Sequence, residues 1–393
     1  MRVAIDAVGI RGHGGAAVLC ELLHWLPTVR PEWKWHIFLF DRHLREFDDP
    51  GVESRVTLEA IKMGNWHIGR LLWVNRHLPA RINAIGVDVL LSFANIAPLR
   101  ACTPQVVFCH QSNAFFCEGI PLSALRKRAR LRFMRNIILR GGLASDAMLV
   151  QTDAMRQRIL SIEPSLNDRI HVVPSGYRTP HGKRCIRAEK KILIDTAERP
   201  RLIYVSHPSE HKNHINLVRA IPRIINTFPS ASLLLTLEKN KTQNRRYNYF
   251  IDELNLEATR YGVYKHVVWL GILNPGEVDY ALRNSDLTVF PSQAESFGLG
   301  LAESMAAGCP IAASDRLYAH DVCGEAAVYF NPSCPESIAH AVLETLNNGS
   351  LLQKLVNKAT ERKSQFSYEF IAERIAAILW KSAHVGFSKC TTM

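Results

Sequence analysis

The sequence has little of what marks metal-bound, disulfide-bonded or membrane-spanning proteins. Its nine cysteines form no CxxC pair and no zinc-ligand spacing, and they are scattered among apolar neighbours. They are expected to be reduced thiols, as in a cytosolic protein. No run of about 18 uncharged apolar residues occurs, so no membrane-spanning helix is expected.

A charged leader, an internal repeat and a low-complexity tract are also not evident. The first residues, Met1-Arg-Val-Ala-Ile-Asp, are typical of a strand rather than a signal peptide, which favours a cytoplasmic location. Acidic residues are outnumbered, 36 against 48 basic, which gives a net charge of +12. This excess predicts an anionic partner, and nucleic acid, phosphorylated small molecules and an anionic membrane surface all fit.

Short apolar runs, typical of buried parallel strands, alternate with helical patterns in both halves of the 393 residues. In the first half the predicted strands are Val3–Ala7, Trp35–Phe40, Val89–Ser92, Gln105–Cys109, Ala147–Gln151 and Ile170–Val173. In the second half they are Leu202–Val205, Ser232–Leu237, Val267–Leu270, Leu287–Phe290, Pro310–Ala313 and Ala327–Phe330. The alternation predicts an α/β protein with two Rossmann-like, doubly wound domains.

The predicted domain boundaries lie where the alternation of strands and helices stops. Residues 1–178 form the first predicted domain, and residues 179–198, rich in Pro, Gly and charge, form a linker. Residues 199–367 form the second domain. Residues 368–393 are predicted to be a helix that returns to the first domain, followed by a tail.

The most informative segment runs from Phe290 to Pro310. A buried strand ends at Pro291, and a helix is predicted from Leu299 to Ala307, stopped by Gly308 and Pro310. The amides at the start of such a helix are a ready site for a diphosphate. Two carboxylates flank that site, Glu295 before the helix and Glu303 on it, and both suit the hydroxyl groups of a nucleotide sugar.

This segment resembles the glutamate-x7-glutamate signature of retaining glycosyltransferase family 4, whose members have the GT-B fold. In that fold two Rossmann-like domains face each other across a cleft. The stretch from Val205 to His214, with Lys212, is similar to the family's lysine segment. Further family motifs follow in order, so the resemblance covers most of residues 200–345.

The resemblance implies a role for each matching residue. Glu303 would bind the donor ribose, Glu295 would lie by the transferred sugar and the diphosphate, and Lys212 would neutralise the leaving diphosphate. The remaining donor-binding residues would be Ser296, Phe297, Gly298, Leu299 and Gly300. Such enzymes need no cofactor and usually no metal, and the sequence has no DxD metal-binding pattern.

One position departs from the family, which usually has an arginine five or six residues before the lysine. This chain has Ser206-His207 there, and a neutral histidine supplies a hydrogen bond but no charge. Because His207, His211 and His214 cluster around Lys212, one of them is expected to be protonated when diphosphate is bound. The alternative is that His207 is an ordinary surface-loop histidine.

The first half supplies the acceptor side of the expected cleft. The resemblance implies that Gly14-Gly15 lies near the acceptor and that His110, at the end of a strand, lies near the transferred sugar as a catalytic residue. The same loop allows another interpretation, because Gly12-x-Gly14-x-x-Ala17 and Asp41 also fit an NAD-dependent oxidoreductase. Cys109 beside His110 could in turn form a nucleophile pair, although buried cysteines are mostly core residues.

The segment Leu122–Arg140 carries seven basic residues and no acid. On a helix, Leu125, Ala129, Phe133, Met134, Ile137 and Ile138 are predicted to form an apolar stripe beside the arginines. This pattern suits docking on an anionic membrane, or an ordinary helix packed on the sheet. A non-enzymatic nucleic-acid-binding protein is a further alternative, but no RRM, KH or zinc-finger pattern accompanies the charge.

The resemblance therefore implies a metal-independent, retaining hexosyltransferase, and the sequence favours a location in the cytoplasm, peripheral on the inner face of the membrane. Its donor would be GDP-mannose or a UDP-sugar, and its acceptor a glycan, free or lipid-linked, in bacterial surface polysaccharide assembly. No nucleic-acid partner is expected. A sugar-nucleotide epimerase remains open as well, because such enzymes also use two facing Rossmann-like domains.

Overall fold

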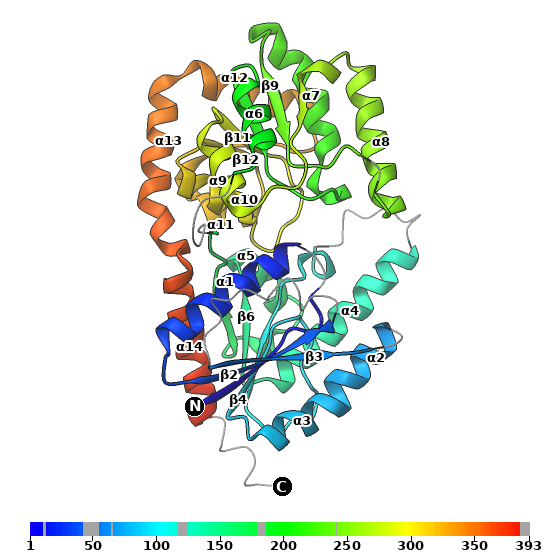
Figure 1. Ribbon diagram of the computed structural model, residues 1–393, viewed down its shortest axis with the longest axis vertical. Coiled ribbons are helices and arrows are strands. Elements are labelled where there is room, and N and C mark those ends of the chain that lie inside the picture. Colours follow the sequence, from blue (N-terminus) through cyan, green and yellow to red (C-terminus); the bar gives the residue numbers. More distant parts are fainter. Residues whose placement is uncertain are drawn as a thin grey trace. The chain divides into compact units, whose positions relative to one another are not determined.

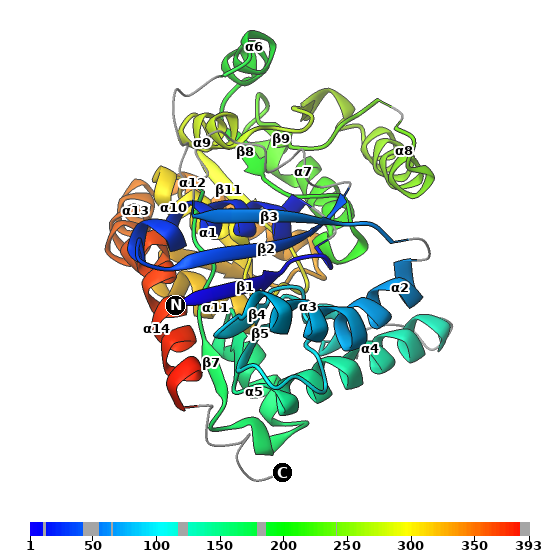
Figure 2. The ribbon, with the colours of Figure 1, turned by 60° about the horizontal axis from the view of Figure 1, so that its bottom comes forward.

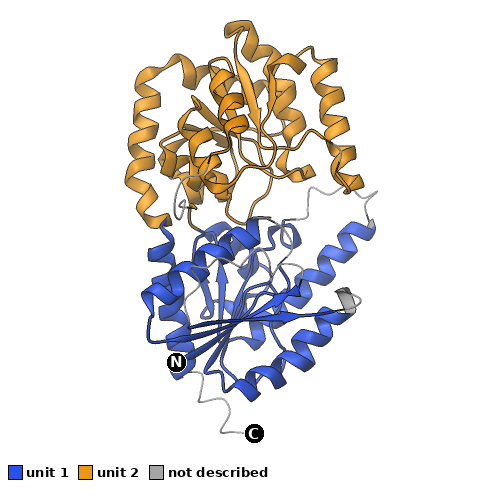
Figure 3. Cartoon of the chain, viewed as in Figure 1, with its two compact units in different colours: residues 1–175, 367–393 blue, residues 176–366 orange. Residues whose placement is uncertain are grey.

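A computed structural model describes residues 1–10, 13–41, 55–63, 66–116, 125–178, 186–240 and 242–385 of the chain. The chain divides into two compact units, shown in Figure 3. Unit 1 comprises Met1–Ser175 and Ser367–Met393, and unit 2 comprises Gly176–Phe366.

Unit 1 is built on a parallel sheet of seven strands in the order β3-β2-β1-β4-β5-β6-β7 (Figures 1 and 2). The strands are β1 Arg2–Asp6, β2 Lys34–Phe40, β3 Val56–Ile61, β4 Val89–Ser92, β5 Gln105–Phe108, β6 Ala147–Val150 and β7 Ile170–Val172. Every residue of β4, β5 and β6 is buried, as expected for central parallel strands covered on both faces.

The helices of unit 1 include one from the end of the chain. They are α1 His13–Val29, α2 Trp66–Leu72, a π-helical turn Trp73–His77, α3 Leu78–Ile85, α4 Leu125–Ala144, α5 Asp153–Leu160 and α14 Tyr368–Val385. Helix α14 packs on α1, β4 and β5. Arg374 donates to the Val172 carbonyl at 2.7 Å, and Arg30 pairs with Glu373 at 2.8 Å. The last helix therefore belongs to the core of unit 1.

Strand β3 and helices α2 and α3 are absent from the sequence-based prediction. Residues of β3 are at most half-buried, because it is the edge strand of the sheet and pairs with β2 alone. Its Glu59 bonds His36 at 2.8 Å and Arg81 at 3.0 Å instead of packing in the core. A short, partly charged edge strand lacks the apolar run by which the central strands are recognised.

Unit 2 repeats the same architecture with six parallel strands in the order β10-β9-β8-β11-β12-β13. They are β8 Arg201–Tyr204, β9 Ser232–Leu235, β10 Val267–Trp269, β11 Leu287–Phe290, β12 Ile311–Ser314 and β13 Ala327–Phe330. The helices are α6 Ala188–Thr196, α7 His214–Thr227, α8 Arg245–Arg260, α9 Pro275–Arg283, α10 Leu299–Ala307, α11 Leu317–Cys323, α12 Pro335–Asn347 and α13 Gly349–Arg362.

The linker predicted over residues 179–198 differs from the structure. Residues 179–185 lie outside the described part of the chain, and residues 188–196 form helix α6 of unit 2. Ile194 of this helix is fully buried in a cluster with Ile203 and Leu270. One buried side chain in a short helix leaves almost no periodic signal in the sequence, so the charged stretch resembles a linker.

Within the described residues, none of the helices is long and apolar enough to cross a membrane.

Candidate functional site

The order of the strands in the sheet of unit 2 reverses between β8 and β11. These two strands are neighbours in the sheet, although two strands and three α-helices separate them in sequence. In open α/β sheets, ligands bind outside the carboxyl ends of the strands at such a switch point. The loops that follow β8 and β11 are residues 205–213 and 291–298. They contain most of the residues predicted for the donor site.

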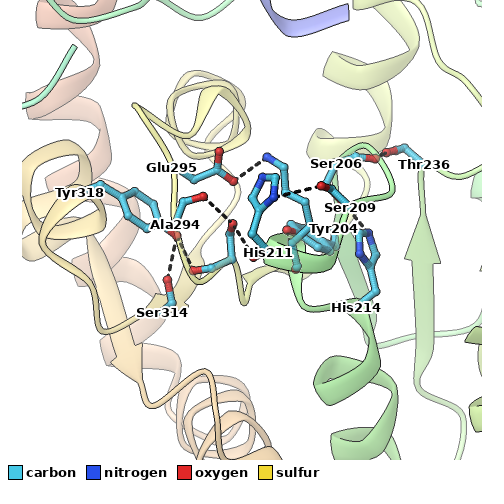
Figure 4. A network of polar contacts seen from close by, with 12 residues as sticks. Tyr204, Ser206, Ser209, His211, His214, Thr236, Ala294, Glu295, Ser314 and Tyr318 are labelled. Atoms are coloured by element: carbon cyan, nitrogen blue, oxygen red, sulfur yellow. Dashed lines mark hydrogen bonds and ion pairs between the residues drawn. The ribbon is translucent and has the colours of Figure 1, made fainter. Parts of the chain in front are cut away.

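Lys212 and Glu295 meet between these two loops, and Figure 4 shows Glu295 within the polar network around them. Lys212 Nζ lies 2.5 Å from Glu295 Oε1, although the residues are 83 positions apart. Their side chains are 18% and 11% exposed, so both charged groups are largely enclosed but remain accessible to a ligand. The two residues predicted for catalysis in this domain are thus direct partners.

Two buried tyrosines hold the loops in place. The Tyr204 hydroxyl donates to the Lys212 carbonyl at 2.9 Å, and the Tyr318 hydroxyl donates to the Ser292 carbonyl at 2.8 Å. Burial raises the pKa of both tyrosines well above the ordinary value, so both hydroxyls remain protonated donors. The Gln293 amide also donates to the His211 carbonyl at 2.8 Å, which joins one loop directly to the other.

Helix α10 begins beside this pair with the predicted bounds. Gly298, its N-cap, has a φ of +93°, a left-handed value that favours glycine. A Cβ on Gly300 would lie 3.1 Å from the Val205 carbonyl oxygen, so glycine lets the helix start close to β8. The backbone amides of the first turn, around Leu299, are the groups at this end of the helix that can bind an anion.

The side chains before the helix differ in what they can do. Phe297 is 2% exposed and packs on Phe366 with ring centroids 5.5 Å apart, so it serves the core of unit 2. Its predicted contact with a donor is therefore limited to its backbone. Ser296 lies at an intermediate level of exposure between Glu295 and Phe297.

Glu303 is the second predicted carboxylate, and it has a partner that the sequence did not suggest. Arg178 Nε donates to Glu303 Oε1 at 2.6 Å, and the side chains are 21% and 6% exposed. The two residues are 125 positions apart. Nothing in the linear sequence joins them, because Arg178 reads as one more basic residue before the predicted linker.

The three histidines near Lys212 have different surroundings. His207 is exposed, and His211 Nδ1 lies 2.9 Å from Ser209 Oγ. His214 is fully buried, with Nε2 2.7 Å from Ser206 Oγ and its ring against Tyr204. Burial, together with Lys212, lowers the pKa of His214 to about 3. His214 is therefore neutral and structural, and the prediction of a protonated histidine at the diphosphate stays with His207 and His211.

In unit 1, His110 follows β5 and contacts the rings of Phe93 and Phe108, with centroids 4.7 and 4.2 Å away. Burial lowers the pKa of His110 to about 4, despite a hydrogen bond with Gln151 that raises it. Burial also raises the pKa of the Cys109 thiol to about 12. The thiol is therefore protonated at neutral pH, which disfavours the nucleophile pair.

The glycine loop of unit 1 is only partly described. Gly14 and Gly15 lie in the first turn of α1, and a Cβ on Gly15 would meet Ile10 Cγ2 at 3.3 Å. Residues 11 and 12 lie outside the described part, so the fingerprint that includes Gly12 is not traced. Asp41 is exposed just after β2.

Helix α4 corrects the predicted apolar stripe. Leu131, Ile138 and Leu139 are buried, whereas Phe133 is 61% exposed. Residues 122–124 at the start of the predicted segment lie outside the described part. The exposed basic residues are Arg126, Lys127, Arg130, Arg132 and Arg140. The helix thus packs on the sheet along one face and presents an aromatic ring among cations on another.

In the described ranges, no group of three or more His, Cys, Asp and Glu side chains is arranged to hold a metal ion.

Unit 2 is similar in sequence to a known protein family. Residues 186–362 match the model of the family Glycosyl transferases group 1. Unit 2 is therefore similar to the group 1 glycosyltransferases. The match includes Lys212, Glu295 and Glu303, and it does not extend to unit 1.

A curated relative agrees with this assignment. An uncharacterised glycosyltransferase from Methanocaldococcus jannaschii is 23% identical over 237 residues, which cover 58% of this chain and 57% of that protein. The chain thus matches little more than half the length of this relative.

Solved structures share the fold over nearly the whole chain. Sucrose-phosphate synthase from Thermosynechococcus elongatus superposes with a TM-score of 0.75 at 17% identity, over 98% of this chain and 100% of that one. HepE from Anabaena, in complex with UDP-glucose, gives 0.70 at 18% identity over 97% and 100%. Together with the two doubly wound sheets, these likenesses confirm the predicted GT-B fold.

Proposed function

We propose that the protein is a retaining glycosyltransferase that moves a hexose from a nucleotide-diphosphate sugar, GDP-mannose or a UDP-sugar, to a hydroxyl group of a glycan. The observation that carries this proposal is the Lys212–Glu295 pair at the switch point of unit 2. It lies next to the start of a helix whose buried acid is Glu303. Such a donor needs a cation and a helix end that bind its diphosphate. It also needs a carboxylate that accepts hydrogen bonds from its hydroxyl groups.

The chemistry follows from the charges. When the bond between the sugar and the diphosphate breaks, negative charge gathers on the leaving phosphate oxygen. Lys212 has three donors, so it can keep Glu295 and still bind that oxygen. The amides at the start of α10 add fixed dipoles that need no rearrangement during the reaction. The acceptor hydroxyl then attacks from the face that the diphosphate leaves and gives its proton to the leaving phosphate oxygen, so the anomeric configuration is retained.

The remaining donor residues have supporting roles in the proposal. Glu303 accepts hydrogen bonds from the ribose hydroxyls, and Glu295 orients the transferred sugar. His207, exposed in the loop after β8, supplies a hydrogen bond to the diphosphate where the family has an arginine. The proposal includes no metal or cofactor, and Lys212 and the amides at the start of α10 are the groups that stabilise the leaving charge.

For the acceptor we propose a lipid-linked glycan at the inner face of a membrane, in bacterial surface polysaccharide assembly. Helix α4 supports this proposal, since it has no acidic residue and exposes Phe133 among arginines. A basic surface with an exposed ring suits the headgroup region of an anionic bilayer. Gly14, Gly15 and His110 of unit 1 would serve the acceptor and the transferred sugar.

The test is a donor screen with the purified full chain. UDP-glucose, GDP-mannose, ADP-glucose and UDP-N-acetylglucosamine are incubated separately, and released nucleoside diphosphate and sugar configuration are measured. We expect release from one donor, with retained configuration, and loss of release in Lys212→Ala. An epimerised but intact nucleotide sugar would favour the epimerase alternative. Binding of NADH without any donor turnover would favour the oxidoreductase.

A further inference from the structure

Unit 2 contains two buried glutamates that pair with arginines, and their surroundings differ. Glu277, on α9, is fully buried, and both of its oxygens are occupied. Oε1 accepts from Arg187 Nε at 2.7 Å and the Arg187 amide at 3.1 Å, while Oε2 accepts from Arg187 Nη2 at 2.7 Å and the Asn274 amide at 2.9 Å. This carboxylate is saturated, which identifies it as a structural cap of its helix.

Glu303 is buried nearly as well but is not saturated. Among the described residues its carboxylate accepts a single hydrogen bond, from Arg178 Nε to Oε1. An ionised carboxylate offers about four acceptor positions on its two oxygens. Oε2 of Glu303 is therefore left to accept other donors, while the charge of Arg178 compensates the carboxylate.

A buried carboxylate that loses its cation is strongly disfavoured. Arg178 also restrains the Glu303 carboxylate, because the bond from Nε to Oε1 is only 2.6 Å long and both side chains are largely enclosed. A fixed acceptor loses less conformational entropy when a ligand hydroxyl binds to it. Charge compensation and orientation thus come from the same residue.

We infer that Arg178 is a positioning residue for the nucleotide donor: it holds Glu303 so that Oε2 receives the ribose hydroxyls. The inference rests on the proposed function, in which Glu303 binds the ribose. It adds a residue that lies outside the part of the chain matched by the family model, residues 186–362. The positive charge beside Glu303 thus comes from Arg178, in the segment that precedes residues 186–362.

The experiment measures nucleotide affinity by calorimetry in the full chain. The probes are UDP and GDP, each beside its 2′,3′-dideoxy analogue, which lacks the ribose hydroxyls. The variants are R178Q, E303Q and the double variant. R187Q is the matched control, because it removes an arginine from the other buried glutamate. R178K keeps the charge without the Nε donor, and thermal unfolding of each variant reports on folding.

For the nucleotide that binds, R178Q and E303Q should each weaken affinity by about 10-fold or more, the worth of a charged hydrogen bond. Neither should change affinity for the dideoxy analogue, and the double variant should bind as E303Q does. R178K should lie between wild type and R178Q. R187Q should lower thermal stability and leave both affinities unchanged.

The outcomes separate the inference from the function beneath it. If E303Q weakens ribose-dependent binding and R178Q does not, Arg178 is a structural partner only and the inference is wrong. Equal weakening of both probes by R178Q would also overturn it, since the ribose would not be involved. If E303Q binds both probes as wild type does, the assignment of Glu303 to the donor fails, and the proposed donor site with it.

Discussion

The first six strands of unit 1 have the same order as the six strands of unit 2, but the charged residues at the two switch points differ in burial. In unit 1 the switch lies between β1 and β4, where Asp6 and Ser92 are register partners. Asp6 is the last residue of its strand and is fully buried, with Oδ1 3.1 Å from Trp73 Nε1. Burial raises the pKa of Asp6, although Arg70 and Trp73 lower it.

In unit 2 the corresponding charges lie beyond the strand ends. Lys212 and Glu295 are eight and five residues past β8 and β11, and both remain partly exposed. An acid inside the last strand position becomes part of the core, whereas an acid or a lysine further along the loop stays within reach of a ligand. The same fold therefore gives a closed polar contact in one unit and an open charged pair in the other.

The largest expected effect tests whether the open pair carries the chemistry. Lys212→Ala should lower donor turnover by about 100- to 1000-fold, because it removes a preorganised positive charge from the leaving group. Lys239, exposed after the neighbouring strand β9, provides the matched control, and Lys239→Ala should turn over donor normally. His110→Ala in unit 1 should cost only about fivefold, the worth of one neutral hydrogen bond. An equal loss in His110→Ala and Lys212→Ala would break the comparison.

Glu303→Ala should act on binding rather than on turnover at saturating donor. The affinity for the nucleoside diphosphate should fall by about 10- to 150-fold, since the ribose loses a charged acceptor. Asp6→Asn in unit 1 should leave this affinity unchanged and lower thermal stability instead. Calorimetric titration and thermal unfolding of both variants decide this. Unaltered nucleotide affinity in Glu303→Ala would contradict the prediction.

The two buried histidines should make both units sensitive to acid in a similar way. Because folding lowers the pKa of His214 to about 3 and of His110 to about 4, the unfolded chain takes up protons first as the pH falls below about 6.5. The stabilising contribution is thus present above about pH 6.5 and is lost toward the folded pKa values. The slope is about 1.4 kcal/mol per pH unit for each histidine.

Hydrogen exchange between about pH 7 and pH 4.5, a range below the ordinary histidine pKa, reports on each unit separately. His214→Gln should flatten the acid-induced loss of protection in unit 2 only, and His110→Gln in unit 1 only. A single variant that changes both units would mean that they do not unfold as separate bodies.

The smallest effect per residue concerns the basic helices. Replacing Arg126, Arg130 and Arg132 of α4 with Gln should weaken binding to anionic vesicles by about fivefold per arginine, from about 1 kcal/mol each near a charged surface. Helix α8 of unit 2 supplies the control, because its arginines accompany Asp252, Glu253 and Glu257. Replacing Arg245, Arg246 and Arg260 there should change vesicle binding little. Wild-type protein that stays in the supernatant at low salt would contradict the membrane proposal.

The sequence alone predicted the central strands of both sheets and named most of the residues of the proposed donor site. Central strands buried on both faces must be continuous apolar runs, so they were predicted to within a residue or two at each end. Helix α10 was predicted with its observed bounds, because glycine and proline mark its ends. The spacing of Glu295 and Glu303 and the segment around Lys212 resemble a glycosyltransferase signature, and that resemblance implies a nucleotide-sugar donor.

Only the tertiary structure decided which charges meet. Glu303 pairs with Arg178 across 125 positions, and Lys212 with Glu295 across 83. Edge strand β3, helix α6 and the exposure of Phe133 were likewise settled by packing. A periodic pattern reports how a segment buries its own side chains, so it identifies strands and helices. Long-range ion pairs depend on the order in which strands assemble into the sheet, and that order leaves no periodic trace in the sequence.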